Sequence, residues 1–330
     1  MTLPASLYSE EKRIGAGRYS SVFAASTTHG RVCVKRVRPS LGSDSLQGVA
    51  NTKAFARELL VLQRLTGASP HIVTFHGAFA RGSDVWIEME LMDCSLDDLI
   101  AAADRRFAES EIATIALAVL KGIEFCHSQG IMHRDVKPGN VVVSKQGKVK
   151  LCDFGLARWI QDSSRSVSYT PEVCTRWYKP VEVLLGTSVH TPGIDVWSFG
   201  CILGELFNLS PLFPGSSDIE QLYLIQAALG AINTTSFPNS DFLSDYGKIE
   251  FDLPPPIGVG NLVPHANPEA VEILESCLTF CPDKRWTAEQ CLKSSFWSRQ
   301  NILGDKELGA CISRVLDAST LQTIPTTAYN

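Results

Sequence analysis

The sequence lacks several features that would assign it to other classes of protein. Its ten cysteines are scattered singly, with no C-x-x-C pair and no cluster of ligands that would predict a zinc site. Such scattered thiols are typical of reduced cytosolic or nuclear proteins, so we expect no disulfide framework. The net charge of −5 gives no basic footprint, and we therefore expect no nucleic-acid partner.

Long apolar runs are also missing. No stretch reaches the length of a membrane-spanning helix, and the start, MTLPASLYSEEKR, lacks the apolar run of a signal peptide. We therefore expect no membrane partner and a cytoplasmic or nuclear location. What is present is an ordinary globular composition, 45% hydrophobic and 20% charged over 330 residues, which suits one large domain or two lobes with a sizeable core.

The first 90 or so residues predict mainly short strands. The valine-rich run at 31–37 and the run at 84–92 have strand patterns. Between them, apolar residues recur at helical spacing over 51–67, and Gly67 is a stop signal. A polar, Gly/Ser-rich loop is expected at 39–50, before that helix.

After about residue 95 the pattern becomes helical. The spacing of apolar residues predicts helices over 109–130, 195–209 and 268–280, and the prolines at 251–258 predict an extended connection. The last 30 or so residues lose periodicity and are expected to form a loosely held tail. The predicted architecture is a small strand-rich lobe followed by a larger helical lobe, with a hinge near Leu91–Asp93.

The segment IGAGRYSSVFAA (14–25) places two glycines between strand-like runs. Gly15 and Gly17 are spaced so that backbone could approach a phosphate closely. Strand patterns on both sides predict a hairpin tip rather than a strand-to-helix turn, which argues against a dinucleotide-binding fold and a Walker loop. Taken alone, the pattern favours a plain glycine hairpin.

Lys35 lies in the middle of the valine-rich strand. Its neighbours at alternate positions, Cys33 and Val37, are apolar, so we expect the lysine to point inward. A buried ammonium without an anion is costly. Glu58 on the downstream helix and an ATP phosphate are two candidate partners, and a solvated edge-strand lysine is the alternative.

The segment IMHRDVKPGN (131–140) mixes charges, a proline, a glycine and an amide. Asp135 could accept the proton of a substrate hydroxyl, and Lys137 could neutralise charge on a transferring phosphoryl group. Asn140 could coordinate Mg²⁺ through its amide oxygen, since hard cations prefer oxygen ligands. His133 is expected to pack and hydrogen-bond behind the site rather than take part in the chemistry.

A predicted hairpin at 141–151 leads into CDFGLAR (152–158). Asp153 follows a strand and lies two residues before Gly155, so its carboxylate is placed to reach a metal.

Together these segments resemble the signature set of eukaryotic protein kinases, over roughly residues 8–297. The resemblance implies an α+β fold of two lobes: a small five-stranded β lobe with one main helix over 1–92, a larger mostly helical lobe over 93–297, and a C-terminal tail over 298–330. The motifs that carry it are, in order, the Gly-rich loop at 15–17, Lys35, Glu58, HRDVKPGN at 133–140, DFG at 153–155, PVE at 180–182, DVWSFG from Asp195, and Arg285.

Carried over by position, the resemblance implies an active kinase that uses ATP and Mg²⁺. It implies that Asp135 is the catalytic base, that Lys137 contacts the γ-phosphate, and that Glu182 and Arg285 form a structural ion pair. The D-x-K-P-x-N pattern around Lys137 is typical of serine/threonine kinases. The remaining implied contacts are Ile14, Gly15, Gly17, Val22, Lys35, Glu58, Met89, Glu90 and Met92 for ATP, and Asn140 and Asp153 for Mg²⁺.

Three later segments resemble the cyclin-dependent kinase group: DFGLAR, YTPEVCTRWYKPVEVLLG and WSFGCILGELFNLSPLFPGSSDIEQL. The last of these and DYGKIEF are most similar to the cell-cycle-related kinase branch, which is linked to cell-cycle control and to cilium or flagellum length. This resemblance implies proline-directed protein substrates, a cyclin or cyclin-like activator, and an upstream activating kinase. The beginning of the Glu58 helix, NTKAFARE, differs from the cyclin-binding helix of the best-known members.

Thr170 stands where this group carries an activating phosphothreonine. Such a phosphate needs cationic partners, and Arg57, Arg134 and Arg158 stand at the matching positions, each beside a catalytic element. Glu172 occupies the place of the second, tyrosine phosphosite of the MAP kinases, which disfavours that alternative. Tyr19, in the Gly-rich loop, matches a position at which the group can be inhibited by phosphorylation.

The sequence departs from the group at three places. Ser20 replaces the third glycine of the loop, which should stiffen it. Lys179 replaces an arginine that shapes the pocket for proline after the target residue, and lysine lacks that planar fork. Ser95 stands near the position of a ribose-binding carboxylate. The competing interpretations are a pseudokinase that acts as a binding module, which the presence of Lys35, Asp135 and Asp153 argues against, and a small-molecule kinase, which the long 153–182 segment disfavours.

Overall fold

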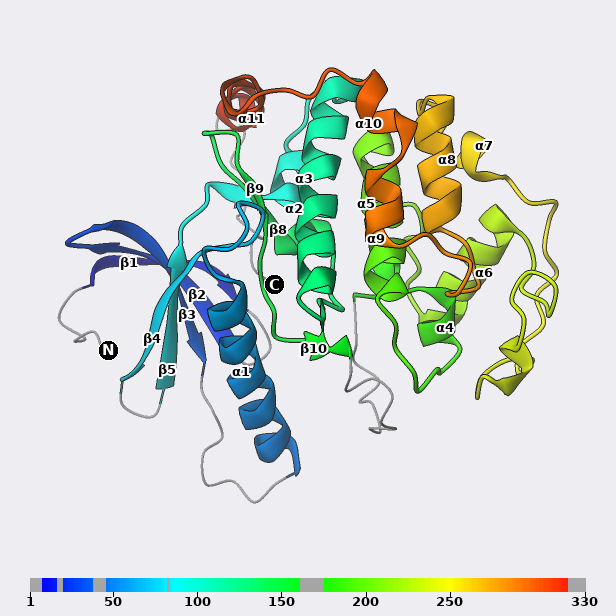
Figure 1. The fold of residues 1–330 in the computed structure, drawn as a ribbon, viewed down its shortest axis with the longest axis horizontal. Helices are drawn as coiled ribbons and strands as arrows, with labels where there is room; N and C mark the ends of the chain where they lie inside the picture. The colour runs from blue at the N-terminus through cyan, green and yellow to red at the C-terminus, as the bar shows by residue number, and fades with distance from the viewer. Residues whose placement is uncertain (1–7, 17–19, 38–45, 82–83, 161–174, 320–330) are drawn as a thin grey trace. The chain divides into compact units, whose positions relative to one another are not determined.

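The computed structural model describes residues 8–16, 20–37, 46–81, 84–160 and 175–319 (Figure 1). The chain divides into two compact units, and it passes between them four times. The first unit comprises residues 1–104, 138–157 and 304–330, and the second comprises 105–137 and 158–303.

The first unit is built on a five-stranded antiparallel sheet, as the sequence predicted. The strand order is β1-β2-β3-β5-β4, so β3 is central and its residues pair on both sides. Lys35 on β3 lies opposite Val22 of β2 and Ile87 of β5. The strands are β1 (Ser9–Ala16), β2 (Ser20–Thr27), β3 (Gly30–Val37), β4 (Phe75–Arg81) and β5 (Asp84–Glu90).

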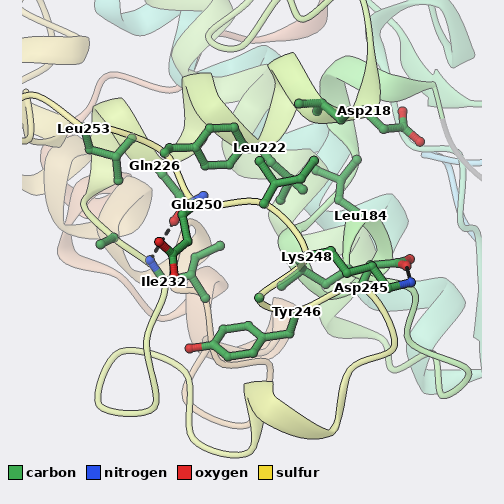
Figure 2. A pocket seen from close by; sticks show the side chains of 16 residues that line it. Leu184, Asp218, Leu222, Gln226, Ile232, Asp245, Tyr246, Lys248, Glu250 and Leu253 are labelled. Atoms are coloured by element: carbon green, nitrogen blue, oxygen red, sulfur yellow. Dashed lines mark hydrogen bonds and ion pairs between the residues drawn. The ribbon is translucent and has the colours of Figure 1, made fainter.

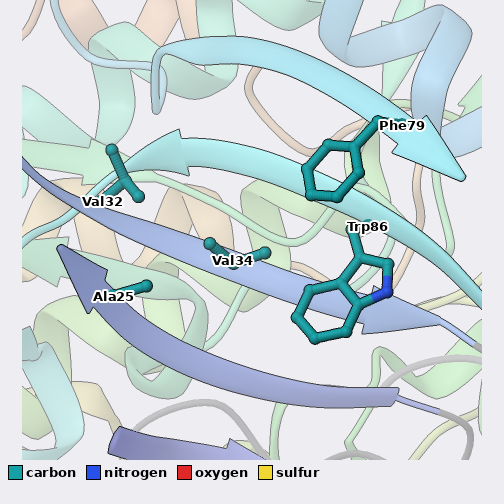
Figure 3. Close-up of a cluster of buried hydrophobic side chains, with 5 residues drawn as sticks. All are labelled: Ala25, Val32, Val34, Phe79 and Trp86. Atoms are coloured by element: carbon teal, nitrogen blue, oxygen red, sulfur yellow. The ribbon is translucent and has the colours of Figure 1, made fainter. Parts of the chain in front are cut away.

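One face of this sheet carries a buried hydrophobic cluster, seen in Figure 3, formed by Ala25, Val32, Val34, Phe79 and Trp86. The Phe79 and Trp86 rings stack with centroids 6.2 Å apart. Because successive side chains of a strand point to opposite faces, Lys35 belongs to the face opposite Val34. Lys35 is nevertheless buried, which confirms the inward direction predicted for it.

Helix α1 (Leu46–Leu65) supplies the second layer of the first unit. Val61, Leu62 and Leu65 are buried, and Glu58 lies on the same buried side of the helix. The helix begins before residue 51, so the loop predicted for 39–50 is wrong over 46–50. This stretch, LQGVA, contains no proline, and four of its five residues are compatible with a helix despite Gly48.

The remainder of the first unit is a small sheet with short helices around it. The hairpin of β8 and β9 was predicted from the sequence, and β6 joins it beside β8. These elements are β6 (Cys94–Ser95), α2 (Leu96–Ala101), η2 (Pro138–Asn140), β8 (Val141–Val143), β9 (Val149–Leu151) and α11 (Asp305–Ser319).

Helix α11 corrects the expectation of a loosely held tail. Leu308, Ile312 and Val315 are buried at helical spacing within the first unit. Lys145 of the β8–β9 turn forms an ion pair with Asp317 of α11 at 2.7 Å. The helical period is present in the sequence, with charged residues on the opposite face, but the low average hydrophobicity of the segment led to the expectation of a tail.

The second unit is mainly helical, and α5 is its centre. Every residue of α5 from Ile194 to Phe207 is buried, because α3 and α8 both pack against this helix. The elements are α3 (Glu109–Ser128), β7 (Ile131–Met132), β10 (Arg158–Trp159), η4 (Arg176–Tyr178), α4 (Val181–Leu184), α5 (Gly193–Asn208), α6 (Asp218–Leu229), η5 (Ser240–Phe242), α7 (Val259–Leu262), α8 (Pro268–Cys277), α9 (Ala288–Leu292) and α10 (Ser295–Arg299).

Glu182 of α4 and Arg285 form the buried ion pair that the resemblance implied. The guanidinium donates to both carboxylate oxygens, at 2.8 and 3.0 Å. It also donates to the carbonyl of Thr279 and lies 5.2 Å from the Trp197 ring centroid. The pair therefore ties α4 to the chain that follows α8.

Two expectations about composition can be compared with the described residues. The cysteines among them are free and buried. Within the same part of the chain, no helix combines the length and the apolar character needed to cross a bilayer.

Candidate active site

The centre of the first unit's polar site is Lys35. Its ammonium lies 2.6 Å from the Glu58 carboxylate and 2.9 Å from Asp153 Oδ1. Burial lowers the pKa of Lys35, but Asp153 and Glu58 outweigh that effect and raise it above its ordinary value. The lysine is therefore charged. Its contact with Glu58 was predicted from the sequence, whereas its contact with Asp153 was not.

Asp153 is the more exposed of the two carboxylates, with 41% of its side chain accessible. Its φ of 58° lies in the left-handed region, and the Gly155 N–H donates to its Oδ1 at 3.3 Å. Immediately before it, the Cys152 N–H donates to the carbonyl of Asn140 at 2.9 Å. Asn140 precedes β8 and Asp153 follows β9, so this bond keeps the two residues expected to hold a metal at the same end of the β8–β9 hairpin.

The donor set at this point fits a hard divalent cation. Asp153 offers carboxylate oxygens and Asn140, which is almost fully buried on η2, offers an amide oxygen. Mg²⁺ prefers such oxygen ligands and is usually bound by one or two protein groups together with phosphate and water. Two side chains are therefore enough for a metal that is bound together with a nucleotide.

The residues expected around adenine also lie in the first unit. Met89 is buried on β5, and Ile14, Gly15 and Val22 belong to the β1–β2 hairpin, where Gly15 lies opposite Val22. The hairpin geometry predicted for the Gly-rich segment is thus confirmed. Among the described residues no hydrogen bond is made by the backbone of Met92, which leaves its N–H and C=O available to a base.

The side chain of Glu90 has a structural role. The carboxylate accepts hydrogen bonds from the Thr74 N–H and from Lys150 Nζ, both at 2.5 Å. Burial raises the pKa of Glu90, and these two bonds outweigh it and lower the pKa below its ordinary range. Any contact of this residue with adenine therefore belongs to its backbone.

Ser95 is used as a helix cap. Its hydroxyl accepts a hydrogen bond from the Asp98 N–H at 3.1 Å, and the Asp98 carboxylate accepts from the Ser95 N–H at 3.1 Å. This reciprocal pair is a capping box at the start of α2. Because the side chain is fully buried, the hydroxyl is not positioned as an exposed ribose ligand.

In the second unit, Asp135 and Lys137 lie together with Thr175. The Lys137 ammonium is 3.1 Å from Asp135 Oδ2 and donates to the Thr175 hydroxyl at 2.7 Å. The Thr175 N–H donates to Asp135 Oδ1 at 3.1 Å. No role was predicted for Thr175, and its position within the 153–182 segment was the only available signal.

Asp195 holds the backbone of the segment that precedes Asp135. Its two carboxylate oxygens accept from the N–H groups of His133, at 2.9 Å, and Arg134, at 2.7 Å. His127 lies 2.8 Å from the same carboxylate. Burial raises the pKa of Asp195, and these hydrogen bonds lower it below its ordinary value. The motif DVWSFG contained the residue, but its partners could not be identified from the sequence.

Two of the three arginines expected to bind a phosphate lie in the second unit. Arg134 is buried beside Asp135 in the chain, and the backbone of Arg158 pairs with Met132. Burial lowers the pKa of His190, and the positive charges of Arg134 and Arg158 lower it further, to about 4. The two arginines thus create a positive potential at one place.

Four of the expected site residues take no part in the contacts described above. Gly17, Tyr19 and Thr170 lie outside the described residues. Arg57 is half-buried on α1 of the first unit. The binding of one phosphate by all three arginines therefore stays a prediction.

Comparison with known proteins identifies the family. A family model described as "Protein kinase domain" matches residues 8–297. Cyclin-dependent kinase 20 of Danio rerio is 37% identical over 287 residues, covering 86% of this chain and 81% of the relative. The chain belongs to the cyclin-dependent kinase family of protein kinases.

Other relatives of this kinase agree. Cyclin-dependent kinase 20 of Homo sapiens is 36% identical over 288 residues, with the same coverage of 86% and 81%. Cyclin-dependent kinase F-3 of Oryza sativa subsp. japonica is 39% identical over 82% of this chain and 59% of the relative. The kinase is thus a serine/threonine protein kinase, and the predicted two-lobe fold class is confirmed.

Proposed function

We propose that this kinase transfers the γ-phosphate of ATP, bound with Mg²⁺, to protein serines and threonines that are followed by proline. The observation that carries the proposal is the ion triad in which the buried Lys35 contacts both the buried Glu58 and the partly exposed Asp153. Phosphoryl transfer of this kind depends mainly on positioning and on electrostatic stabilisation, which such a triad can supply.

In the first unit the roles follow from charge. Lys35, held by Glu58, would bind the α- and β-phosphates, because its ammonium remains charged. Asp153 and Asn140 would hold Mg²⁺, which when bound neutralises charge on the phosphates. Ile14, Val22 and Met89 supply apolar surface for the base.

In the second unit Asp135 would accept the proton of the substrate hydroxyl. The neighbouring Lys137 ammonium lies 3.1 Å from its Oδ2 and helps to hold the carboxylate in place. Thr175 orients this carboxylate through its N–H and receives the Lys137 hydrogen bond through its hydroxyl. Lys137 would then be positioned to contact the γ-phosphate.

The test is transfer of labelled phosphate from Mg-ATP to a basic protein substrate. The Asp135→Asn variant should lower kcat by about 10²–10⁴-fold while ATP binding remains, because only the base is lost. Asp104→Asn, at an exposed carboxylate, is the matched control and should leave kcat unchanged. Wild-type protein that binds Mg-ATP but labels no polypeptide would instead favour the pseudokinase alternative.

We propose that phosphorylation of Thr170 by an upstream kinase activates the enzyme. The positive potential around Arg134, Arg158 and His190 supports this, because a phosphate of nearly two negative charges would be favoured there. Thr170→Ala should abolish activation by an upstream kinase without changing the melting temperature. Unchanged activity in that variant would rule the switch out, and a Tyr19→Phe variant tests separately for inhibition at the Gly-rich loop.

Preference for proline after the target residue rests on the segment around Lys179. This lysine is buried, and its ammonium lies 3.5 Å from Asp218 of α6. A positional-scanning peptide library should select proline after the phosphorylated residue. Lys179→Arg should sharpen that selection, because the guanidinium restores the planar fork.

We further propose activation by a cyclin or cyclin-like protein that binds α1. Leu60 on this helix is 58% exposed and offers a partner protein an apolar contact on α1. Leu60→Asp should abolish binding to a panel of purified cyclins while Mg-ATP binding is retained. If the variant binds as the wild type does, the activator does not use this surface.

A role in the cell cycle or at the cilium is supported only by the resemblance to the cell-cycle-related branch. We propose a cytoplasmic or nuclear enzyme that can also reach the cilium. A fluorescent fusion at native expression level tests the location, and deletion with measurement of cilium length tests the role.

A further inference from the structure

The second unit contains a groove of about 680 Å³ that no catalytic residue lines. Its walls come from the end of α4, from α6, and from the irregular chain between α6 and α7 (Figure 2). Leu184, Leu222, Ile232 and Leu253 are among the apolar side chains that line it. A volume of this size is in the usual range for ligand sites in proteins.

Hydrogen bonds hold the walls of the groove in place. The Asp245 N–H donates to the carbonyl of Leu185 at 3.1 Å, which attaches the irregular chain to the end of α4. The Gln226 side chain accepts from the Ile232 N–H at 3.0 Å, and the Gly258 N–H donates to the carbonyl of Ala228 at 2.9 Å. The groove is therefore formed before any ligand binds, which reduces the entropy cost of binding.

Large apolar side chains remain accessible along this groove. Ile219 on α6 is 52% exposed and Ile249 on the opposite wall is 46% exposed, and both line the groove. Tyr223 is 37% exposed and packs edge-on against Phe251, a lining residue, with centroids 5.7 Å apart. Concentration of exposed apolar side chains at one concave site is typical of a surface that binds a partner.

The charges at the groove are mainly negative. Three carboxylates line it, on Asp218, Asp245 and Glu250, against the single ammonium of Lys248. Asp218 already has cationic partners in Arg176 and Lys179, and Asp245 has one in Lys248.

Glu250 remains as the uncompensated carboxylate of the lining. It is exposed, and no ion pair joins it to another residue in the described ranges. Asp252, also exposed, lies two residues further along the same chain. An occupant that carries positive charge is therefore favoured at this end of the groove.

We propose that this groove is a docking site for a protein segment that presents aliphatic or aromatic side chains next to Lys or Arg. The apolar side chains would fill the space between Leu222, Ile232 and Ile249, and the basic residue would approach Glu250. Docking of this kind does not require phosphoryl transfer, so it is independent of the proposed catalytic roles.

Two other occupants fit the charges less well. A second copy of the chain bound through the same surface would bring the two Glu250 carboxylates toward one another, which costs free energy. A fatty acid would place its own carboxylate at an acidic edge. Both are retained as outcomes of the experiment.

The experiment begins with a phage-displayed library of random 12-residue peptides panned on the full chain. Enriched peptides should combine Leu, Ile, Phe or Trp with Lys or Arg. Their binding is then measured as synthetic fluorescent peptides by polarisation. Ile249→Asp should weaken binding at least about tenfold, since a charge replaces a central apolar contact. Glu250→Lys should weaken it by about 3–10-fold and reduce its dependence on salt.

Matched controls use the same substitutions at comparable positions. Ile257 is 48% exposed on the same irregular chain but does not line the groove, and Glu275 is an exposed carboxylate on α8. Ile257→Asp and Glu275→Lys should leave peptide binding within about twofold of wild type. The melting temperature of each variant shows that it is folded.

Four results would overturn the proposal. These are the absence of an enriched class of peptides, enrichment of acidic peptides, and equal binding to the wild type and to Ile249→Asp. The fourth is evidence for another occupant: light scattering that shows a dimer abolished by Ile249→Asp, or native mass spectrometry that shows a bound acyl chain.

Discussion

At the scale of single residues, the two segments proposed to carry the chemistry contain backbone that is held in an uncommon conformation. Arg134 and Asp153 have φ values of 67° and 58°, in the left-handed region that favours glycine. Such a residue costs about 1–3 kcal/mol and persists only where its surroundings hold it. For Arg134 the holding group is the Asp195 carboxylate, which accepts its N–H at 2.7 Å.

Asp195→Asn should therefore reduce activity without touching a substrate. An amide can accept only through one oxygen, so one of the N–H groups of His133 and Arg134 loses its acceptor. We expect a loss of about 1–3 kcal/mol in the free energy of unfolding and a decrease in kcat of about 100-fold. Urea unfolding and steady-state kinetics measure the two effects, with Asp104→Asn as control; wild-type kcat would show that this carboxylate does not position the segment.

His190 should make stability depend on pH. Its pKa is about 4 in the folded state because it is buried and faces Arg134 and Arg158. The unfolded chain has the ordinary, higher pKa, so between about pH 6.5 and 4 it binds more protons than the folded chain. Stability contributed by neutral His190 is therefore complete above pH 6.5 and is lost as the pH falls toward 4.

The comparison variant is His190→Gln, which cannot titrate. The wild type should lose about 1–2 kcal/mol more than this variant between pH 6.5 and 4, after solvent screening is allowed for. Urea unfolding at a series of pH values measures the difference. His265→Gln, at an exposed histidine, should follow the wild type, and parallel curves for wild type and His190→Gln would contradict the assignment.

At the scale of elements, α11 completes the first unit. Two lysines of the β8–β9 hairpin, Lys145 and Lys148, form ion pairs with Asp317 and Asp305 near the two ends of this helix. Between them, Gly309 approaches the hairpin so closely that a Cβ would lie 2.3 Å from the carbonyl oxygen of Lys145. The helix thus packs backbone to backbone against the turn.

Gly309→Ala should therefore destabilise the protein. Alanine normally stabilises a helix relative to glycine by about 1 kcal/mol, but here its methyl group meets a carbonyl that cannot move aside easily. We expect a net loss of about 1–3 kcal/mol in the free energy of unfolding. Gly260→Ala on α7, where nothing lies within 4 Å of the added Cβ, is the control and should be neutral or stabilising. A stabilised Gly309→Ala would show that α11 does not pack in this way.

At the scale of the whole molecule, ligand binding and folding are linked. Any ligand that binds only the folded chain raises its free energy of unfolding, by about 2.7 kcal/mol at 100 times Kd. The groups expected to bind Mg-ATP are parts of the folded first unit, where α1, β3 and the end of β9 bring Glu58, Lys35 and Asp153 together. Mg-ATP should therefore increase the melting temperature of the chain.

Asp153→Asn should remove most of that increase, because an amide holds Mg²⁺ less strongly than a carboxylate. Differential scanning fluorimetry with Mg-ATP, and with ATP in EDTA, measures the effect. The increase should depend on the metal in the wild type and be nearly absent in the variant. An equal increase in both proteins would show that Asp153 is not a metal ligand.

Much of the site could be recognised from the sequence because its residues occur in short, ordered segments. The inward direction of Lys35 followed from the apolar residues beside it. Glu58 was one of two candidate partners, and the resemblance to protein kinases implied the pairing. The longer helices were also predicted to within a few residues. Helix α11 and the first turn of α1 were not predicted. Helix α11 has an apolar face but a low average hydrophobicity, and burial of Leu308, Ile312 and Val315 stabilises it.

The order of residues along the chain by itself determined the strand and helix periods, the hairpin at the glycine-rich segment and the identity of the charged groups. Only the tertiary structure decided which distant groups meet. It joined Asp195 to the backbone at 133–134, Thr175 to Asp135, and α6 to the chain at 245–253 around the groove. The reason is physical: periodicity is a local property, whereas a contact between residues 60 positions apart depends on how whole elements pack.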